Sequence, residues 1–414
     1  MNILFLTSHY LPSPSANGMN TLKIVEYLEK KGHKVTCICV ANNSEELENE
    51  MIGKTEIVRI SKSSYMEKID KEYNKKYSNY ILLIKRRFSN LINLYKFPAF
   101  DDNQNAKTFD ALFETVESKN FDCVISVFKP YANIYALSKL KKIFPNLITI
   151  AYLLDFISSI KKPKFFPNRL YKILISNTYK KIEKDFDMIL VPENVQSEIG
   201  FDKISQSEKI NIINFPTFLE NIQFEKQNSI VNSPTLNLIY AGTLDKNYRN
   251  PEKALVILSQ VAQNTKIKIN FYGKNNCEEI IEKYRSENLD IVMNGLADHN
   301  VIIQKMLDAD IVLNISNKGV NAIPSKIFEL FSIGKPIINF VESENDVSLE
   351  YFRKYPVNLN VFVNEDKNKN IQSIIDFNLT NSKKIIDRDI LLKMYEKNLP
   401  SYTGNKILNF IGEK

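Results

Sequence analysis

Glycine residues follow three consecutive predicted strands in the second half of the sequence, and they are the first sign of a ligand site. Gly242, Gly273 and Gly295 each stand within two residues of the end of a short apolar run. Glycine lets a ligand approach the backbone closely, and the carboxyl ends of neighbouring parallel strands meet at one edge of a sheet. With only 11 glycines in 414 residues, three at such places favour a shared binding edge over three ordinary turns. The same loops contain Thr243, Tyr272 and Lys274.

A second group of polar residues stands at the predicted start of a helix in residues 321–336, NAIPSKIFELFSIGKP. Pro324 suits the first turn of a helix, which places Ser325 and Lys326 at its amino end. Backbone N–H groups at such an end, together with the helix dipole, bind diphosphate groups. Glu329 lies one turn further on the same face, where its carboxylate could accept both hydroxyls of a ribose or pair with Lys326.

Alternating strands and helices must position these residues. In the first half, strands are predicted at 2–6, 34–40, 123–127, 147–154, 186–191 and 210–213, and helices at 21–31, 109–116 and 134–142. In the second half, strands are predicted at 236–240, 267–272, 291–293, 311–315 and 336–340, and helices at 251–263 and 300–307. The composition of residues 60–100, rich in Lys, Arg, Tyr and Asn, predicts an inserted helical region. The polar composition of residues 219–235 predicts a linker. This order predicts an α/β protein with two Rossmann-like halves and a ligand between them, at the carboxyl ends of the strands.

The composition excludes several classes of protein. Hydrophobic residues make up 44% and charged residues 25%, which is typical of a globular chain with two or three domains. No run approaches the roughly 18 apolar residues of a membrane span, so we expect neither membrane insertion nor export. The four cysteines and three histidines lack the spacing of a zinc site or a disulfide framework, which favours a reducing cytoplasm. No dinucleotide, Walker or nucleic-acid-binding motif occurs.

Positive charge is concentrated in the first half of the chain. Residues 1–200 contain 29 Lys and Arg against 22 Asp and Glu, whereas residues 201–414 contain 26 of each, so the net charge of +7 belongs to the first half. Residues 62–96 and 161–181 are both basic and aromatic. This composition predicts peripheral contact with an anionic membrane, the alternative being a solvated surface helix. The residues assigned to this membrane and acceptor side are Lys85, Arg86, Arg87, Lys161, Lys162, Lys164, Phe165, Phe166 and Arg169.

Several of these segments together resemble retaining glycosyltransferases of the GT-B fold, especially the large family 4 and its relatives. PSKIFELFSIGKPII resembles their donor-binding helix, YAGTLDKNYRNPEKAL resembles the start of their donor domain, and the loop at Asn17 and Gly18 corresponds to their N-terminal glycine loop. The resemblance covers most of the chain. It implies two Rossmann-like, doubly wound parallel-sheet domains that face a central cleft. Residues 1–215 would bind the acceptor, residues 216–400 would bind the nucleotide sugar, and a helix at 401–414 would pack back on the first domain.

The resemblance also implies roles for individual residues. Arg249, with a contribution from Lys326, would neutralise the charge that develops on the leaving diphosphate. Glu329 would hold the ribose, and Gly18 would cover the phosphates from the first domain. Asp155 is the predicted acceptor ligand or base, and its alternative role is a helix N-cap. The predicted donor-binding residues are Gly18, Gly242, Thr243, Tyr272, Gly273, Lys274, Gly295, Asn321, Ala322, Ile323, Pro324, Ser325 and Glu329.

Two positions depart from the family pattern. Asn321 replaces the first of two glutamates that stand eight positions apart, and Thr243 replaces an arginine. Enzymes of this fold generally need no bound metal, and the pair Asp308 and Asp310 is expected to be a polar joint rather than a metal site.

The expected function is therefore retaining transfer of a sugar from a nucleotide diphosphate sugar, with a UDP-sugar as the expected donor. The expected acceptor is a glycan or lipid-linked oligosaccharide in the synthesis of a bacterial surface polysaccharide, such as capsule or lipopolysaccharide. The expected location is the cytoplasm, with peripheral contact to the inner face of the cell membrane, and neither a cofactor nor a nucleic-acid partner is expected. Two alternatives stay open. One is a non-catalytic subunit of this fold that binds glycan or a partner transferase, and the other is a different GT-B activity, either an inverting transferase or a nucleotide-sugar epimerase.

Overall fold

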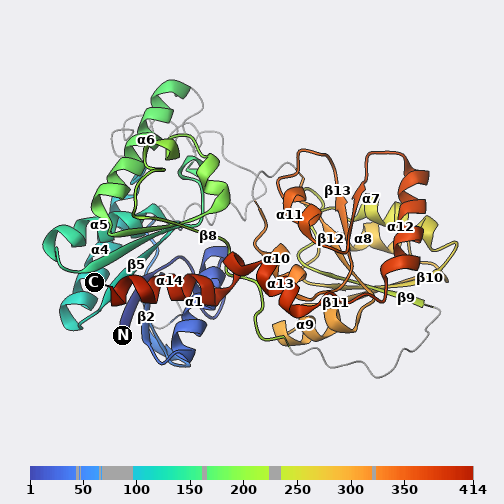
Figure 1. Cartoon of the computed structure of the whole chain (residues 1–414), viewed down its shortest axis with the longest axis horizontal. Helices are drawn as coiled ribbons and strands as arrows, with labels where there is room; N and C mark the ends of the chain where they lie inside the picture. The colour runs from blue at the N-terminus through green and yellow to red at the C-terminus, as the bar shows by residue number, and fades with distance from the viewer. Residues whose placement is uncertain are drawn as a thin grey trace. The chain divides into compact units, whose positions relative to one another are not determined.

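The computed structural model describes residues 1–42, 46, 48–64, 67, 97–160, 166–222, 235–318 and 323–413. The chain divides into two units, Met1–Thr217 with Lys397–Lys414 and Phe218–Glu396. Each unit is built on its own sheet (Figure 1). The division falls two residues after the boundary expected from the sequence, and both units have the predicted α/β architecture.

An eight-stranded sheet organises the first unit, in the order β3-β4-β2-β1-β5-β6-β7-β8. The strands are β1 (Asn2–Leu6), β2 (Lys34–Val40), β3 (Asn49–Ile52), β4 (Thr55–Ile60), β5 (Cys123–Phe128), β6 (Ile148–Leu153), β7 (Met188–Pro192) and β8 (Ile210–Ile213). The helices are α1 (Ala16–Lys30), α4 (Asp102–Ser118), α5 (Tyr131–Ile143), α6 (Asn168–Asp185) and α14 (Pro400–Gly412). All strand pairs are parallel except the β3–β4 hairpin. Helices cover both faces, so the central strands are continuous apolar runs rather than alternating ones.

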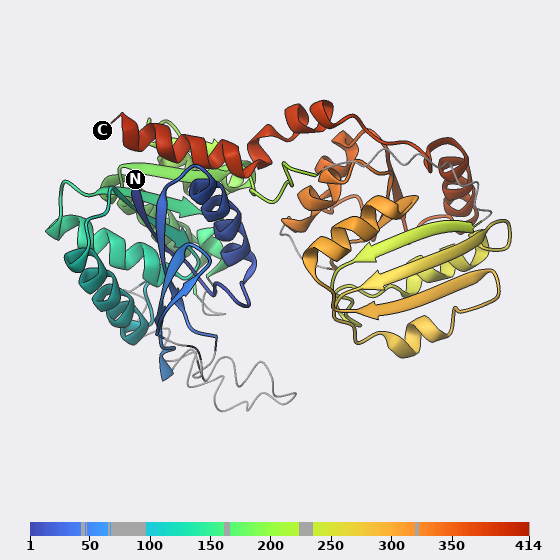
Figure 2. The ribbon, with the colours of Figure 1, turned by 90° about the horizontal axis from the view of Figure 1, so that it is seen from below.

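The last helix of the chain belongs to the first unit. α14 packs against α1, as Figure 2 shows. Gly404 allows this contact, because a Cβ atom at this position would lie 2.3 Å from the ring of Tyr27. The hydroxyl of Tyr27 donates a hydrogen bond of 2.6 Å to the side chain of Asn405. The chain therefore returns to its first unit after completing the second.

A six-stranded sheet with only parallel pairs organises the second unit, in the order β11-β10-β9-β12-β13-β14. The strands are β9 (Thr235–Ala241), β10 (Lys266–Tyr272), β11 (Leu289–Gly295), β12 (Ile311–Ile315), β13 (Ile337–Val341) and β14 (Asn358–Phe362). The helices are α7 (Glu252–Val261), α8 (Glu278–Glu282), α9 (His299–Asp308), α10 (Lys326–Ser332), α11 (Leu349–Lys354), α12 (Lys367–Asn381) and α13 (Arg388–Met394). Right-handed crossovers place α7 and α8 on one face of the sheet and α9, α10 and α11 on the other. The direction of winding reverses between β9 and β12, where ligands bind in folds of this kind.

Aspartates fix the amino ends of strands in both sheets. Asp122, Asp187 and Asp310 each directly precede a strand, and each carboxylate accepts a hydrogen bond of 2.6–2.8 Å from a backbone N–H of the neighbouring strand. The donors are Asn2, Thr149 and Asn237. Asp310 therefore has a structural role at the edge opposite to the one where a ligand is expected. In the described parts of the chain, no group of three His, Cys, Asp or Glu side chains could hold a metal ion.

Every strand predicted from the sequence occurs within two residues of its expected bounds, but three strands were missed. β3 and β14 are edge strands that carry polar residues, and β4 lies inside the sheet but mixes polar and apolar residues in the short sequence TEIVRI. α1 begins five residues earlier than predicted, because the hydroxyl of Ser15 caps the helix by accepting from the N–H of Gly18. Most of the inserted helical region predicted at 60–100, and most of the linker predicted at 219–235, lie outside the described residues.

Candidate functional site

The three predicted glycine loops of the second unit lie side by side at the carboxyl ends of β9, β10 and β11. The N–H of Gly242 donates to the carbonyl of Tyr272 at 2.9 Å, and the N–H of Gly273 donates to the carbonyl of Gly295 at 2.7 Å. Tyr272 is buried below these loops, whereas Thr243 and Lys274 are exposed. We call the three loops the glycine edge. Its surface is mainly backbone, which a diphosphate or a sugar can approach closely.

Two of the glycines are required for different reasons. Gly273 has φ +126°, and a Cβ atom there would lie 2.2 Å from the carbonyl oxygen of Gly242. Gly295 has φ +67°, but a Cβ atom there would have no neighbour within 4 Å. Gly273 therefore permits the close contact between two loops, and Gly295 permits an open left-handed turn.

Arg249 lies against the glycine edge. Its Nε donates to the side-chain oxygen of Asn317 at 2.9 Å, and its guanidinium also reaches the carbonyl of Thr243 at 3.5 Å. A Cβ atom at Gly242 would lie 3.4 Å from this guanidinium and 2.9 Å from the hydroxyl of Tyr240. Burial raises the pKa of Tyr240, so its hydroxyl stays a donor, and it bonds the Thr243 carbonyl at 3.1 Å. The arrangement holds a positive charge beside the backbone of the first glycine loop.

The sequence did not identify Asn317 as part of this site. Its position in the sequence could have indicated this role, since Asn317 follows the end of β12 by two residues, at the same edge as the glycine loops. Asn317 orients the arginine and leaves the remaining guanidinium N–H groups for an anion.

α10 begins where the sequence predicted, with Ser325 at the N-cap position and Lys326 as its first residue. One face of the helix is buried in aromatic rings. Phe331 stacks on Tyr355 and Tyr395 at ring-centroid distances of 5.0 and 5.1 Å, and Phe328 packs against Tyr351 at 5.2 Å. The opposite face presents Lys326 and Glu329, which are partly exposed. Rigid aromatic packing therefore fixes the direction in which these two charged residues point.

Glu329 contacts a residue that the sequence analysis missed. His299 is the first residue of α9, and its Nε2 lies 3.0 Å from Oε2 of Glu329. The Glu329 side chain is 12% exposed and that of His299 is 44% exposed. α9 was predicted to begin one residue later, and its first residue was treated as a scattered histidine without a role.

The predicted donor-binding residues that precede α10 are only partly described by the structure. Ile323, Pro324 and Ser325 form the turn that leads into α10, and the carbonyl of Pro324 accepts from the N–H of Ile327 at 3.1 Å. Asn321 and Ala322 lie outside the described residues.

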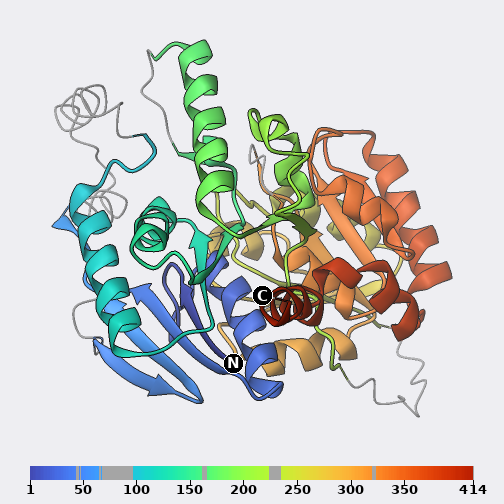
Figure 3. The same ribbon diagram turned by 60° about the vertical axis from the view of Figure 1, so that its left-hand side comes forward.

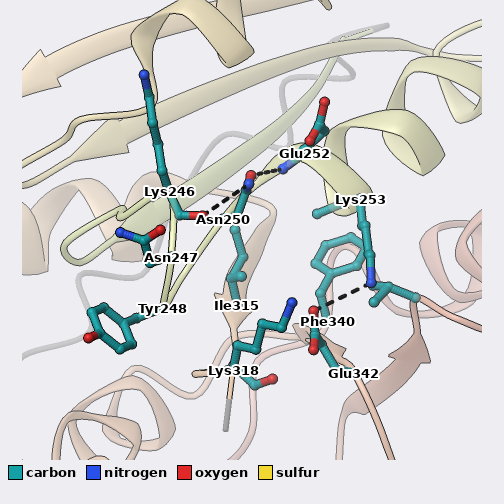
Figure 4. A pocket seen from close by; sticks show the side chains of 13 residues that line it. Lys246, Asn247, Tyr248, Asn250, Glu252, Lys253, Ile315, Lys318, Phe340 and Glu342 are labelled. Atoms are coloured by element: carbon teal, nitrogen blue, oxygen red, sulfur yellow. Dashed lines mark hydrogen bonds and ion pairs between the residues drawn. The ribbon is translucent and has the colours of Figure 1, made fainter.

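A cavity of about 260 Å³ opens at the carboxyl ends of β12, β13 and β14, next to the start of α7 (Figure 4). None of the residues predicted from the sequence lines it. The Nζ of Lys253 lies 3.4 Å from Glu342 and 2.6 Å from the side chain of Asn364. Lys318 extends beside Ile315 and Phe340, and it lines the cavity together with Lys246 and Lys253.

In the first unit, the structure places Asp155 next to the N-terminal glycine loop. The side-chain amide of Asn17 donates to Asp155 and to the carbonyl of Phe128, both at 3.1 Å. Gly18 lies in the first turn of α1, and a Cβ atom there would lie 2.0 Å from the carbonyl oxygen of His9. The glycine at position 18 is therefore needed for the close packing of α1 on its own preceding loop.

The alternative role of Asp155 as a helix N-cap is wrong. The short helix that follows spans Ile157–Ser159, and the residue at its N-cap position is Phe156. The backbone N–H groups of Ile157 and Ser158 donate to the carboxylate of Glu198 instead, at 2.9 and 2.5 Å. Among the described residues, Asn17 is the hydrogen-bond partner of the Asp155 carboxylate, at the carboxyl edge of the sheet.

Of the residues assigned to the membrane and acceptor side, two are described. Phe166 is half-buried and Arg169 is exposed, at the start of α6. Figure 3 shows α6 extending away from the other helices of its unit. Leu170 and Ile173, one turn apart on this helix, are 49% and 47% exposed. The others, Lys85, Arg86, Arg87, Lys161, Lys162, Lys164 and Phe165, lie outside the described residues. Among the described helices, none is long and apolar enough to cross a membrane.

Comparison with known proteins finds similarity in structure. No model of a protein family matches the sequence, and no curated protein matches it. The fold is similar to that of sucrose-phosphate synthase from Thermosynechococcus elongatus, with a TM-score of 0.59 and 11% identity over 100% of both chains. It is also similar to an α,α-trehalose-phosphate synthase (UDP-forming) from Burkholderia vietnamiensis, with a TM-score of 0.60 and 8% identity over 100% of both chains. The lipopolysaccharide outer core galactosyltransferase WaaB has a TM-score of 0.59 and 12% identity over 100% of this chain and 99% of its own. The chain therefore has the two-domain GT-B fold of these glycosyltransferases, as the sequence resemblance implied.

Proposed function

We propose that the protein is a retaining glycosyltransferase that uses a nucleoside-diphosphate sugar, with UDP-sugar as the expected donor. The observation that carries this proposal is the glycine edge with its charged neighbours in the second unit. Three backbone loops joined by hydrogen bonds lie beside Arg249, and α10 carries Lys326 and Glu329. The similar structures support the donor class. One is a UDP-forming synthase, and a trehalose-6-phosphate structure from E. coli, with a TM-score of 0.57 and 13% identity, is bound with UDP-2-fluoro glucose.

The chemistry follows from the charges at this edge. Breaking the bond between a sugar and a diphosphate leaves negative charge on the departing diphosphate. Preorganised cations and N–H groups stabilise that charge more strongly in the transition state than in the bound donor. Arg249 is oriented for this role by Asn317. Glu329 supplies a carboxylate that can accept hydrogen bonds from the two hydroxyls of a ribose, which would fix the nucleoside end of the donor.

The test measures thermal stabilisation by UDP, GDP, ADP, CMP and TDP, with the wild type and Glu329→Ala in parallel. A ligand at 100 times its Kd stabilises the folded state by about 2.7 kcal/mol, which a melting curve resolves easily. We expect one nucleotide to raise the Tm of the wild type and to raise that of the variant much less.

The control variant is Glu282→Ala, because Glu282 is an exposed glutamate in the same unit whose carboxylate pairs with Arg285 on the surface. It should respond to nucleotide as the wild type does. If no nucleotide raises the Tm of the wild type, the donor site does not exist and a non-catalytic role is favoured. If the wild type and Glu329→Ala respond equally, the ribose role of Glu329 is wrong.

For the acceptor, we propose a glycan or lipid-linked oligosaccharide of a bacterial surface polysaccharide, reached at the inner face of the cell membrane. The support is α6, where exposed Leu170 and Ile173 stand beside the exposed cations Arg169 and Lys172.

Each cation near an anionic leaflet contributes about 1 kcal/mol to the free energy of membrane binding. Replacing Arg169 and Lys172 by alanine should therefore weaken binding to phosphatidylglycerol vesicles about thirtyfold in a sedimentation assay. The matched control replaces Lys367 and Lys369 of α12, which are exposed lysines of the second unit. Equal vesicle binding by the wild type and by the α6 variant would rule out this surface.

A further inference from the structure

The contact between His299 and Glu329 joins two helices at the proposed donor site. His299 opens α9 and Glu329 lies in the middle of α10. Their side chains meet at 3.0 Å between Nε2 and Oε2. A carboxylate without a proton only accepts hydrogen bonds, so Nε2 of the histidine carries the proton in this contact. The imidazole thus donates directly to one oxygen of the carboxylate that we assign to the ribose.

The backbone of Glu329 is fixed, but its carboxylate needs a second support. Aromatic packing of Phe328 and Phe331 holds α10 from behind. A glutamate side chain nevertheless has three torsions, and the last one is broad, so a rigid helix does not by itself orient the carboxylate plane. A donor at 3.0 Å from Oε2 removes this freedom. A carboxylate has about four acceptor positions on its two oxygens, so one hydrogen bond does not exhaust its capacity.

We infer that His299 is a positioning residue, which holds the Glu329 carboxylate in the orientation that accepts the two ribose hydroxyls of the donor. This inference rests on the proposed function, because it assigns a support to the ribose-binding group of the same site. The contact with His299 would also make the site specific for ribonucleotides. A carboxylate that is fixed to face two hydroxyls makes fewer hydrogen bonds with a nucleotide that lacks one of them.

The exposure of the two side chains agrees with this division of roles. Glu329 is largely enclosed and His299 is more exposed, so the histidine reaches inward from the surface to the carboxylate. The nearest charged neighbour along α10 is Lys326, one turn before Glu329 on the same face. On α9 the neighbouring charge is Asp298, at the N-cap position of the helix.

The experiment measures the Kd of UDP and of 2′-deoxy-UDP by calorimetry, for the wild type, His299→Leu, His299→Gln and Glu329→Gln. If another base gives the larger thermal stabilisation, the diphosphate of that base and its 2′-deoxy form are used. The readout is the Kd of 2′-deoxy-UDP divided by the Kd of UDP. A general loss of stability would not change this ratio.

We expect His299→Leu to weaken UDP binding about tenfold, which corresponds to 1.4 kcal/mol, and to change 2′-deoxy-UDP binding much less. The ratio should therefore fall towards one. His299→Gln should keep the ratio close to that of the wild type, because the Nε2 of glutamine can donate from a similar position. Asn300→Leu is the matched control, since Asn300 is the next residue of α9 and is exposed.

The outcomes separate the inference from the proposed function. If His299→Leu keeps the wild-type ratio while Glu329→Gln loses it, the ribose site is real and the inference about His299 is wrong. If the leucine and glutamine variants lose the ratio equally, the hydrogen bond is not the cause, and the inference fails. If Glu329→Gln also keeps the ratio, the ribose role of Glu329 is wrong and the inference fails with it. If no nucleotide binds, the proposed donor site itself is overturned.

Discussion

At the carboxyl edge of the first sheet, side chains close the loops onto one another, whereas at the same edge of the second sheet the loops meet through their backbones. Asn17 connects Asp155 to the carbonyl of Phe128 in the first unit. In the second unit, Tyr272 and Gly273 connect the loops of Gly242 and Gly295 through main-chain hydrogen bonds. The two edges occupy equivalent places in two related sheets, yet they are built from different groups.

This difference indicates what each edge can recognise. A backbone surface with a few fixed charges suits phosphate and sugar oxygens, which need N–H groups and cations at close range. The residue types at an edge built from side chains can differ to suit different ligands, because these positions are not restricted to glycine. The second edge therefore suits the nucleoside-diphosphate sugar that we propose as the donor, and the first edge suits the proposed acceptor.

The largest effect is expected at Arg249. Arg249→Ala should lower kcat of sugar transfer by 10²–10³, because one preorganised group that stabilises developing charge contributes about 2.7–4 kcal/mol. The measurement is the steady-state rate of nucleotide release with saturating donor. Arg285→Ala is the control, since Arg285 is an exposed arginine that pairs with Glu282 in the same unit. A rate within a factor of two of the wild type for Arg249→Ala would contradict the role.

Gly273→Ala should destabilise the second unit by about 3 kcal/mol. The left-handed backbone costs about 1–2 kcal/mol for a residue with a Cβ atom, and the overlap with the Gly242 carbonyl adds to it. Urea unfolding measures the change. Gly295→Ala should cost only about 1 kcal/mol, because a Cβ atom there has open space. Equal costs for the two substitutions would show that loop contact does not hold the glycine edge together.

Asp187 offers a test at the amino end of the first sheet, where both units use aspartates in the same way. Burial alone raises the pKa of Asp187, but hydrogen bonds from Lys141 and from Thr149 outweigh it, and the pKa lies below its ordinary value of 3.8. A lowered pKa in the folded state contributes stability above the unfolded pKa, and this stability is lost as the pH falls through the folded value. Asp187→Asn should therefore be about 2 kcal/mol less stable than the wild type at pH 7.

The difference between the wild type and Asp187→Asn should begin to shrink below about pH 4, where the aspartate of the unfolded chain takes up a proton, and should shrink further as the pH falls through the lowered folded pKa. Chemical unfolding at pH 7 and at pH 3 measures both values. A difference that stays constant over this range would mean that the charge of Asp187 does not matter. Asp202→Asn is the control, because Asp202 is exposed and pairs only with its neighbour Lys203 among the ion pairs of the described residues.

The smallest effect is expected at the carboxyl edge of the first sheet, where Asp155 lies. Asp155→Asn should lower the rate of transfer to the acceptor about tenfold and leave nucleotide binding unchanged, because Asp155 and the glycine edge belong to different units. Parallel calorimetry with nucleotide and rate measurement with acceptor separate the two effects. A change in nucleotide affinity would argue that Asp155 acts on the donor rather than on the acceptor.

The buried strands and the start of α10 could be predicted because their signals are local. Continuous apolar runs such as Cys123–Phe128 and Ile311–Ile315 belong to strands buried on both faces. Pro324 and Ser325 predicted the start of a helix within one residue. Strands β3 and β14 could not be found in this way, because they lie at the edges of their sheets and carry polar residues.

The sequence by itself determined the two βα series, the glycines at the strand ends and the charged residues on α10, since each depends on the order and type of neighbouring residues. Only the tertiary structure decided which of these groups meet. His299 and Glu329 are 30 positions apart, and Arg249 and Asn317 are 68 apart. Such pairs depend on which strands are neighbours and on which face of the sheet each crossover helix lies. Local sequence patterns do not encode these choices, because the packing of the whole sheet settles them.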